Sequence, residues 1–145
     1  MNKESLHLPA ALENIRVIEW GSSVSAPFCG RLLGDLGADV IKIEPPEFGD
    51  NSRLSGPYPD QTPDPEQSGL FLFANLNKRG ITIDLNQAKG FKLFNQLLAT
   101  ADVFIENQPY EQIKETGIDY QFLNNEYPHL VVTSITPYGR TGPCS

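Results

Sequence analysis

The 145-residue sequence has only two cysteines and two histidines, and it lacks any long apolar run. Cys29 and Cys144 lie far apart and outside any CxxC or Cys/His spacing, so the pattern predicts neither a disulfide framework nor a zinc site. No stretch of about 18 apolar residues occurs, and the charged start of the chain has no apolar signal-peptide region. We therefore expect a cytoplasmic protein without a membrane segment.

Positive charge is also scarce, because the formal net charge is -7. A broad surface that binds DNA, RNA or an anionic membrane is therefore not expected. His7 and His129 stand apart from any pattern of metal ligands or general bases, and no Ser/His/Asp or Cys/His set can be assembled. The residue pattern thus predicts neither a metal site nor a catalytic set of these kinds.

Five short apolar runs are present, at residues 15–20, 40–44, 81–85, 103–106 and 130–135. Their β-branched content and their lack of strict alternation are typical of strands covered on both faces. Helical patterns separate several of these runs. Ser25, Asn86 and Asp119 are the expected capping residues of three helices. The apolar stripe of the first helix is Phe28, Leu32, Leu33 and Leu36, and that of the second is Phe91, Phe94, Leu97 and Leu98.

Strands that alternate with helices predict right-handed βαβ crossovers and a mainly parallel sheet. We therefore expect an α/β, Rossmann-like fold that forms one domain over residues 1–145. Residues 45–68 contain six prolines among Gly, Asp and Ser, and this composition predicts a long surface loop within that domain.

Ligands of such sheets collect beyond the carboxyl ends of the strands. The stretch 21–27 follows the first strand and opens a helix, where free N–H groups favour a phosphate or carboxylate. It is not GxGxxG, which makes an NAD-dependent dehydrogenase a poor alternative. Asn107 directly follows the fourth strand, on the ligand side. Lys78 and Arg79 precede the expected third strand and are predicted to lie in a solvated turn.

Several segments together resemble a known family. They are LENIRVIE at 12–19, LGDLGADVIKIE at 33–44, NKR at 77–79 with TIDL at 82–85, ADV at 101–103 with EN at 106–107, and GRTGP at 139–143. In this order and spacing they look like the CaiB/BaiF, or class III, CoA-transferase family, and the likeness covers nearly the whole chain from Leu12.

The resemblance implies a CoA-binding domain of an enzyme that moves coenzyme A between an acyl-CoA and a carboxylic acid. It implies an interlocked homodimer, no tightly bound cofactor, and a nucleophilic aspartate that forms an aspartyl-CoA thioester. In the family that aspartate lies about two dozen residues after the GRTGP segment, beyond Ser145. The 145-residue chain alone is therefore expected to be inactive.

The family's CoA contacts carry over onto eleven positions. Pro45, Asn86 and Glu115 stand where members of the family carry an arginine or a lysine, which removes charge-assisted contacts to CoA phosphates. The expected contact residues are Val24, Ser25, Pro45, Ile83, Asp84, Leu85, Asn86, Asn107, Gln108, Pro109 and Glu115.

Two alternatives stay open from the sequence. An acyl-CoA racemase of the same superfamily would share this region, although the NKR segment at 77–79 favours the transferase branch. The other alternative is a CoA-binding or regulatory module without catalysis.

Overall fold

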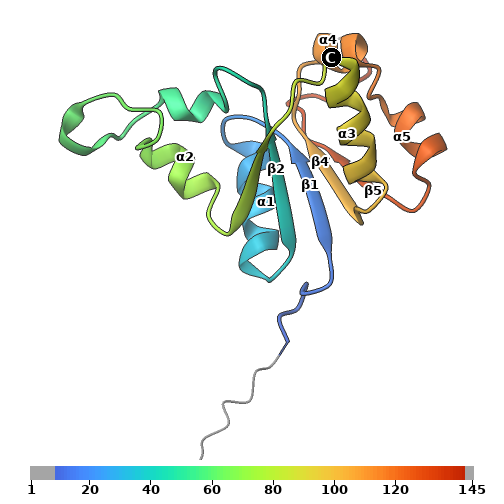
Figure 1. The fold of residues 1–145 in the computed structure, drawn as a ribbon, viewed down its shortest axis with the longest axis horizontal. Coiled ribbons are helices and arrows are strands. Elements are labelled where there is room, and N and C mark those ends of the chain that lie inside the picture. Colours follow the sequence, from blue (N-terminus) through green and yellow to red (C-terminus); the bar gives the residue numbers. More distant parts are fainter. Residues whose placement is uncertain (1–8, 143–145) are drawn as a thin grey trace, which may run out of the picture.

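A computed structural model describes residues 9–142 and contains one five-stranded sheet (Figure 1). The strands are β1 (Arg16–Trp20), β2 (Asp39–Glu44), β3 (Lys78–Thr82), β4 (Val103–Glu106) and β5 (Val131–Ser134). Their order is β3-β2-β1-β4-β5, and every neighbouring pair is parallel. The predicted parallel α/β plan is therefore confirmed. His7, Cys144 and Pro143 lie outside the described residues.

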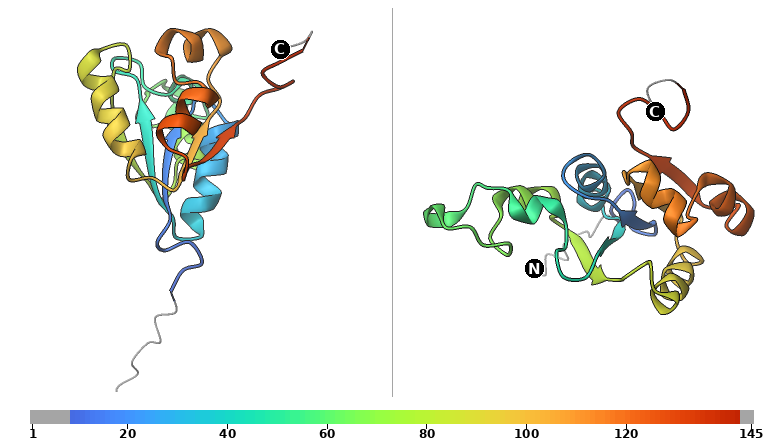
Figure 2. Two further views of the ribbon diagram at one scale, coloured as in Figure 1. Left: turned by 90° about the vertical axis from the view of Figure 1, so that its right-hand side faces the viewer. Right: turned by 90° about the horizontal axis from the view of Figure 1, so that it is seen from above.

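Helices cover the two faces of the sheet unequally (Figure 2). One face carries α1 (Ser25–Asp35), beside which α2 (Gly69–Ala74) packs. The other face carries α3 (Ala88–Leu98) and α5 (Tyr120–Glu126), and α4 (Tyr110–Thr116) lies above the carboxyl end of the sheet (Figure 1 and Figure 2), with Ile113 in the same core. Since β2 and β4 lie on opposite sides of β1, the chain reverses direction across the sheet between β1 and β4. That position is the topological switch point, where α/β folds bind ligands.

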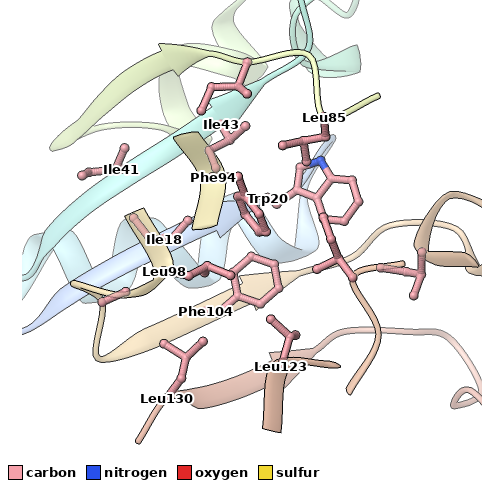
Figure 3. Packing of buried hydrophobic residues seen from close by; sticks show 14 residues of the cluster. Ile18, Trp20, Ile41, Ile43, Leu85, Phe94, Leu98, Phe104, Leu123 and Leu130 are labelled. Carbon is pink, nitrogen blue, oxygen red and sulfur yellow. The ribbon is translucent and has the colours of Figure 1, made fainter. Parts of the chain in front are cut away.

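The larger hydrophobic core lies between the sheet and α3, α4 and α5 (Figure 3). Phe94 of α3 sits at its centre, with ring centroids 6.3 Å from Trp20 and 5.7 Å from Phe104. A smaller cluster under α1 contains Val17, Ala26, Ala38, Val40 and Ile105. The predicted stripe of α3 therefore faces the core.

The helix boundaries correct two of the three expected caps. Asp119 caps α5 as predicted, because its Oδ1 accepts a hydrogen bond from the Phe122 N–H at 2.8 Å. Val24 holds the capping position of α1, which places Ser25 inside the helix. Gln87, not Asn86, precedes α3, since Asp84 binds the Asn86 N–H in a tight turn. The short helices α2 and α4 were not predicted.

The apolar stripe expected along α1 is largely exposed. Phe28, Leu32 and Leu36 face outward, whereas the buried positions of this helix are Ala26, Pro27 and Gly30. A Cβ on Gly30 would overlap Glu19 Oε2. Small residues therefore bring α1 close to β1, and its large apolar side chains remain on the outside.

The third strand begins earlier than the predicted run 81–85. Its parallel register pairs Val40 with Lys78 and Glu44 with Thr82, so Lys78 and Arg79 lie within β3. The predicted turn is therefore wrong for both residues. The predicted solvation is also wrong for Lys78, whose side chain is only 2% exposed beside Glu19, whereas the Arg79 side chain is 64% exposed. Ile83 and Leu85 follow β3 and are buried in the core beside α3. The Ile83 N–H still donates to Glu44 O of β2 at 3.0 Å.

The segment 45–68 is irregular, as its prolines predict, but it is not wholly a surface loop. It contains 3-10 turns at Asn51–Leu54 and Pro59–Gln61. Asp50, Ser52 and Ser68 are buried. Among residues 9–142, every helix is too short or too polar to cross a membrane.

Candidate functional site

The loops that follow β1 and β4 meet at the switch point, at the amino end of α1. Asn107 joins them. Its Oδ1 accepts a hydrogen bond from the Ser22 N–H (2.9 Å), and its Nδ2 donates to Ser22 O (2.8 Å) and Ser25 Oγ (2.9 Å). The amide that the sequence offers as a ligand contact is therefore engaged in shaping the β1–α1 loop, residues 21–24.

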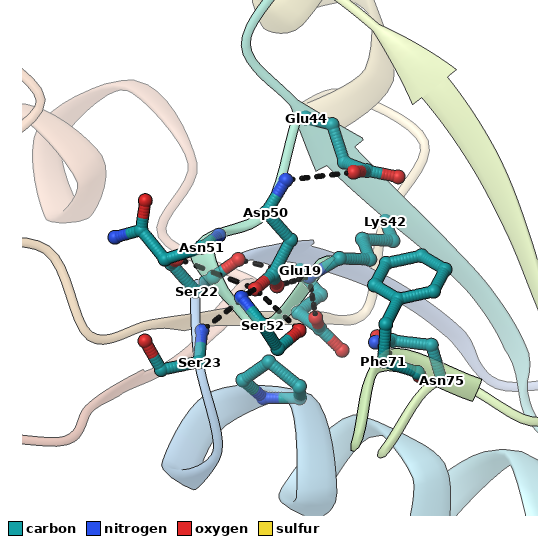
Figure 4. A network of polar contacts seen from close by, with 12 residues as sticks. Glu19, Ser22, Ser23, Lys42, Glu44, Asp50, Asn51, Ser52, Phe71 and Asn75 are labelled. Atoms are coloured by element: carbon teal, nitrogen blue, oxygen red, sulfur yellow. Dashed lines mark hydrogen bonds and ion pairs between the residues drawn. The ribbon is translucent and has the colours of Figure 1, made fainter. Parts of the chain in front are cut away.

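Asp50 holds the same loop from the other side (Figure 4). Its Oδ1 accepts hydrogen bonds from the Ser23 N–H at 2.9 Å and from the N–H and Oγ of Ser52, each at 2.7 Å. Ser23 has a left-handed backbone, with φ of 65°. Burial would raise the pKa of Asp50, but the Lys42 charge and the Ser52 hydrogen bonds outweigh it and hold that pKa below its usual value.

A buried chain of alternating charges runs away from Asp50 beneath α1. Lys42 Nζ lies 2.7 Å from Asp50 Oδ2 and 3.0 Å from Glu19 Oε1, and it donates to Gly21 O at 2.9 Å. Lys78 Nζ lies 2.7 Å from Glu19 Oε2 and also donates to Pro27 O. We call Asp50, Lys42, Glu19 and Lys78 the buried charge chain.

The side chains of the buried charge chain are all at most 2% exposed. Burial lowers the pKa of Lys78 to about 8, although Glu19 acts to raise it. The buried charge chain thus connects the β1–α1 loop at one end with α2 at the other. At the end of α2, Asn75 Oδ1 accepts a hydrogen bond from Lys78 at 2.7 Å.

Two more strand-end glutamates are matched by arginines. Arg53 Nε and Nη2 donate to the two carboxylate oxygens of Glu44 at 2.7 and 2.9 Å, and its guanidinium stacks 3.6 Å from the Phe71 ring centroid. Arg140 pairs with Glu106 through Nη2 alone, which donates to both carboxylate oxygens. Burial opposes ionisation of Glu44, but Arg53 and the Asp50 N–H lower its pKa overall. The buried carboxylates at this edge are thus neutralised by cations.

Pockets open at the carboxyl edge of the sheet. One of about 440 Å³ lies beyond β4 and β5, lined by Asn107, Gln108, Tyr110 and residues 135–140. It adjoins an apolar pocket of about 380 Å³ beside α4 and α5, and the two share Tyr110 and Arg140. A third, of about 450 Å³, lies beyond β2 and includes Pro45 and Arg53. Cavities of this size suit a substantial organic ligand.

The predicted contact residues are distributed along this edge. Val24, Ser25 and Pro109 are exposed near the switch point, with the half-buried Asn107 and Gln108 beside them. Ile83 and Leu85 are buried in the larger hydrophobic core. Pro45 lines the third pocket, Asp84 and Asn86 form the turn before α3, and Glu115 is exposed on α4.

Sequence reasoning did not identify the buried charge chain as part of this site. The sequence does contain an indication of it. Glu19 and Lys42 lie in apolar runs predicted to form buried strands, and a buried charge requires a partner. Within residues 9–142, no cluster of three or more His, Cys, Asp and Glu side chains is arranged to hold a metal ion.

Comparisons with known proteins agree with this architecture. Residues 12–145 match the family model described as CoA-transferase family III. The chain is 38% identical over 134 residues to mouse succinyl-CoA:glutarate CoA-transferase, covering 92% of this chain and 30% of the relative. It is 41% identical to succinate–glutarate CoA-transferase of Agrobacterium fabrum, covering 91% and 34%.

A solved structure is also similar. A CaiB/BaiF family protein from Brucella suis superposes with a TM-score of 0.82 at 37% identity, covering 94% of this chain and 36% of that one. The chain therefore spans about a third of the length of the relatives it matches.

Proposed function

This chain belongs to CoA-transferase family III, and we propose that it supplies the CoA-binding region of an enzyme that moves coenzyme A between an acyl-CoA and a carboxylic acid. The names of the relatives from mouse and Agrobacterium fabrum both support transfer rather than racemisation. Because the chain covers about a third of those proteins, the activity is proposed for the whole enzyme, which we expect to be an interlocked homodimer in the cytoplasm.

The carboxyl edge of the sheet is the proposed binding surface. The β1–α1 loop is shaped there by side chains from two other strand-end loops, and α1 directs its amino end toward the same place. Free N–H groups at a helix start favour the phosphates of a nucleotide. The pockets beyond β4 and β5 offer apolar surface beside that position. The observation that carries the proposal is this convergence of loops at the switch point.

The chemical step needs a carboxylate nucleophile. The buried carboxylates at the carboxyl edge, Glu19, Glu44, Asp50 and Glu106, are paired with cations, which disfavours attack on a thioester. We propose that an aspartate beyond Ser145 attacks the acyl-CoA carbonyl and expels CoA thiolate, leaving a mixed anhydride. The thiolate then attacks the aspartyl carbonyl, which releases the donor acid and forms aspartyl-CoA.

The acceptor acid completes the exchange by the same chemistry in reverse. Its carboxylate attacks aspartyl-CoA and expels the thiolate, giving a second mixed anhydride. Thiolate attack on the acceptor carbonyl then yields the new acyl-CoA and restores the aspartate. Each step exchanges one leaving group for another at a carbonyl carbon, so no oxidant or metal is consumed.

Titration of the 145-residue chain with CoA, followed by backbone amide NMR, tests the binding proposal. We expect saturable shifts at residues 21–26, 83–86 and 107–110, with NADH giving none there. Shifts confined to the opposite edge, around Glu13, Arg16 and Asp102, would contradict the proposed site. A complete absence of saturable shifts would contradict CoA binding by this region.

A further inference from the structure

We propose that Asp50 is a positioning residue that holds the β1–α1 loop in its ligand-binding shape, acting from the 45–68 segment. The inference rests on the proposed function, because it concerns the same loop. Asp50 is 1% exposed, so its carboxylate is too deep to contact a ligand in the pockets. Its influence must pass through the groups it binds.

The β1–α1 loop needs such support. Ser23 is not glycine, yet its φ of 65° lies in the left-handed region, which costs a residue with a side chain free energy. The Asp50 carboxylate accepts the N–H of that residue at 2.9 Å. Asn107 fixes the preceding Ser22 through both its N–H and its C=O. Ser23 is therefore held in place by Asp50 while its neighbour is held by Asn107.

Asp50 is itself held in place. Lys42 contacts its second oxygen at 2.7 Å, and Ser52 donates twice to the first. Ser22 Oγ adds a surface link, because it accepts the Asn51 N–H at 3.1 Å and lies 3.4 Å from Asp50 Oδ1. The carboxylate that receives the Ser23 N–H thus has a fixed position, which a solvated side chain would not have.

The effect of Asp50 on CoA binding depends on how often the β1–α1 loop adopts its present shape. If the loop adopts its present shape for only a tenth of the time, the apparent Kd for a ligand of that shape rises tenfold. Asp50→Asn keeps an oxygen for the Ser23 N–H but turns an NH₂ group toward Lys42. We therefore expect faster hydrogen exchange at the Ser23 amide and about tenfold weaker CoA binding.

The matched control is Asp60→Asn, which removes one carboxylate from an exposed position of the same segment. It should leave both the Ser23 exchange rate and the CoA Kd unchanged. Adding Ser23→Gly to Asp50→Asn should recover part of the affinity, because glycine adopts the left-handed backbone without the steric cost. A purely stabilising role of Asp50 would lower the unfolding free energy of Asp50→Asn but leave the CoA Kd of the folded variant unchanged.

The outcomes separate the two proposals. If the wild-type chain fails to bind CoA, the proposed function is contradicted, and the Ser23 exchange rate alone then decides whether Asp50 positions the loop. If wild type binds but folded Asp50→Asn binds equally well, the positioning role is overturned.

Asp50→Asn leaves Lys42 without its partner, and such a variant can fail to fold. In that event Ser22→Ala, which buries no charge, replaces it. We then expect faster Ser23 exchange and about threefold weaker CoA binding. Unchanged values of both would overturn the inference.

Discussion

Lys78 shows how one buried residue affects the response of the whole chain to pH. Its pKa is about 8 in the folded chain and 10.5 in the reference state. Between these values the unfolded chain binds more protons, so the free energy of unfolding rises with pH across this window, by about 3 kcal/mol at most. We expect Lys78→Met to abolish this rise, as measured by urea unfolding at pH 7.5, 8.5 and 9.5.

The control for this prediction is Lys89→Met, which removes an exposed lysine of α3. Cys29 and Tyr127 also titrate at alkaline pH, with pKa values raised first of all by burial, but they are present in all three proteins. If the unfolding free energy of Lys78→Met depends on pH as that of wild type does, Lys78 is not the group that titrates.

For single residues, the sequence shows that a charge lies in a segment expected to be buried, but it does not show which residue neutralises that charge. Glu19 and Lys42 stand in apolar runs and could have been expected to need partners. Their pairing depends on the β1–β2 register, which places them side by side, and on the return of Asp50 from an irregular segment. Prolines predict that a segment is irregular, yet they do not predict which of its residues become buried.

Among the helices, α3 is the one whose packing follows directly from its pattern. Phe94 is fully buried between Trp20 and Phe104, whereas Leu93 on the same helix is 51% exposed. We expect Phe94→Ala to cost about 3–5 kcal/mol of unfolding free energy and Leu93→Ala less than about 0.5 kcal/mol. Urea titrations followed by circular dichroism measure both. Equal losses for the two variants would contradict the burial of this helix.

The contrast with α1 explains why periodicity predicts one helix correctly and misplaces the other. Both have apolar residues at helical spacing, but only α3 turns its large side chains inward. In α1 the contact side is set by Ala26, Pro27 and Gly30, which allow close approach to the buried charge chain. Hydrophobic periodicity detects large apolar side chains, and it does not detect a helix that packs through small ones.

For the whole molecule, the alternation of strands and helices is enough to predict the parallel sheet, because βαβ crossovers have one hand. The carboxyl ends of parallel strands lie at one edge of the sheet, so that edge is predictable as the general location of the candidate site. That β1 and β4 are neighbours is known only from the observed strand order. The hydrogen bonds that hold Ser22 and Ser23 are not predictable, since they come from the side chains of Asn107 and Asp50 in two other loops. Ser23 and Asp50 are 27 positions apart in the sequence, and Ser22 and Asn107 are 85 apart.

The outward side of α1 carries a group of exposed apolar side chains. Val24, Phe28, Leu32 and Leu36 recur at four-residue intervals and are 38–52% exposed, and Phe73 of α2 stacks on Phe28 with centroids 5.9 Å apart. Clustered exposed apolar side chains favour association. We expect sedimentation velocity to detect concentration-dependent self-association of the 145-residue chain, and Leu32→Glu to shift it toward monomer.

A control variant on the other face of the sheet shows whether the effect of Leu32→Glu is specific to the α1 surface. Leu93→Glu introduces the same charge at a leucine of similar exposure on α3, on the opposite face of the sheet. It should leave the association unchanged if the α1 surface drives it. Equal dissociation by both variants would indicate a general effect of negative charge on a chain whose net charge is already -7. A wild-type chain that sediments as a monomer at high concentration would show that this surface does not promote self-association.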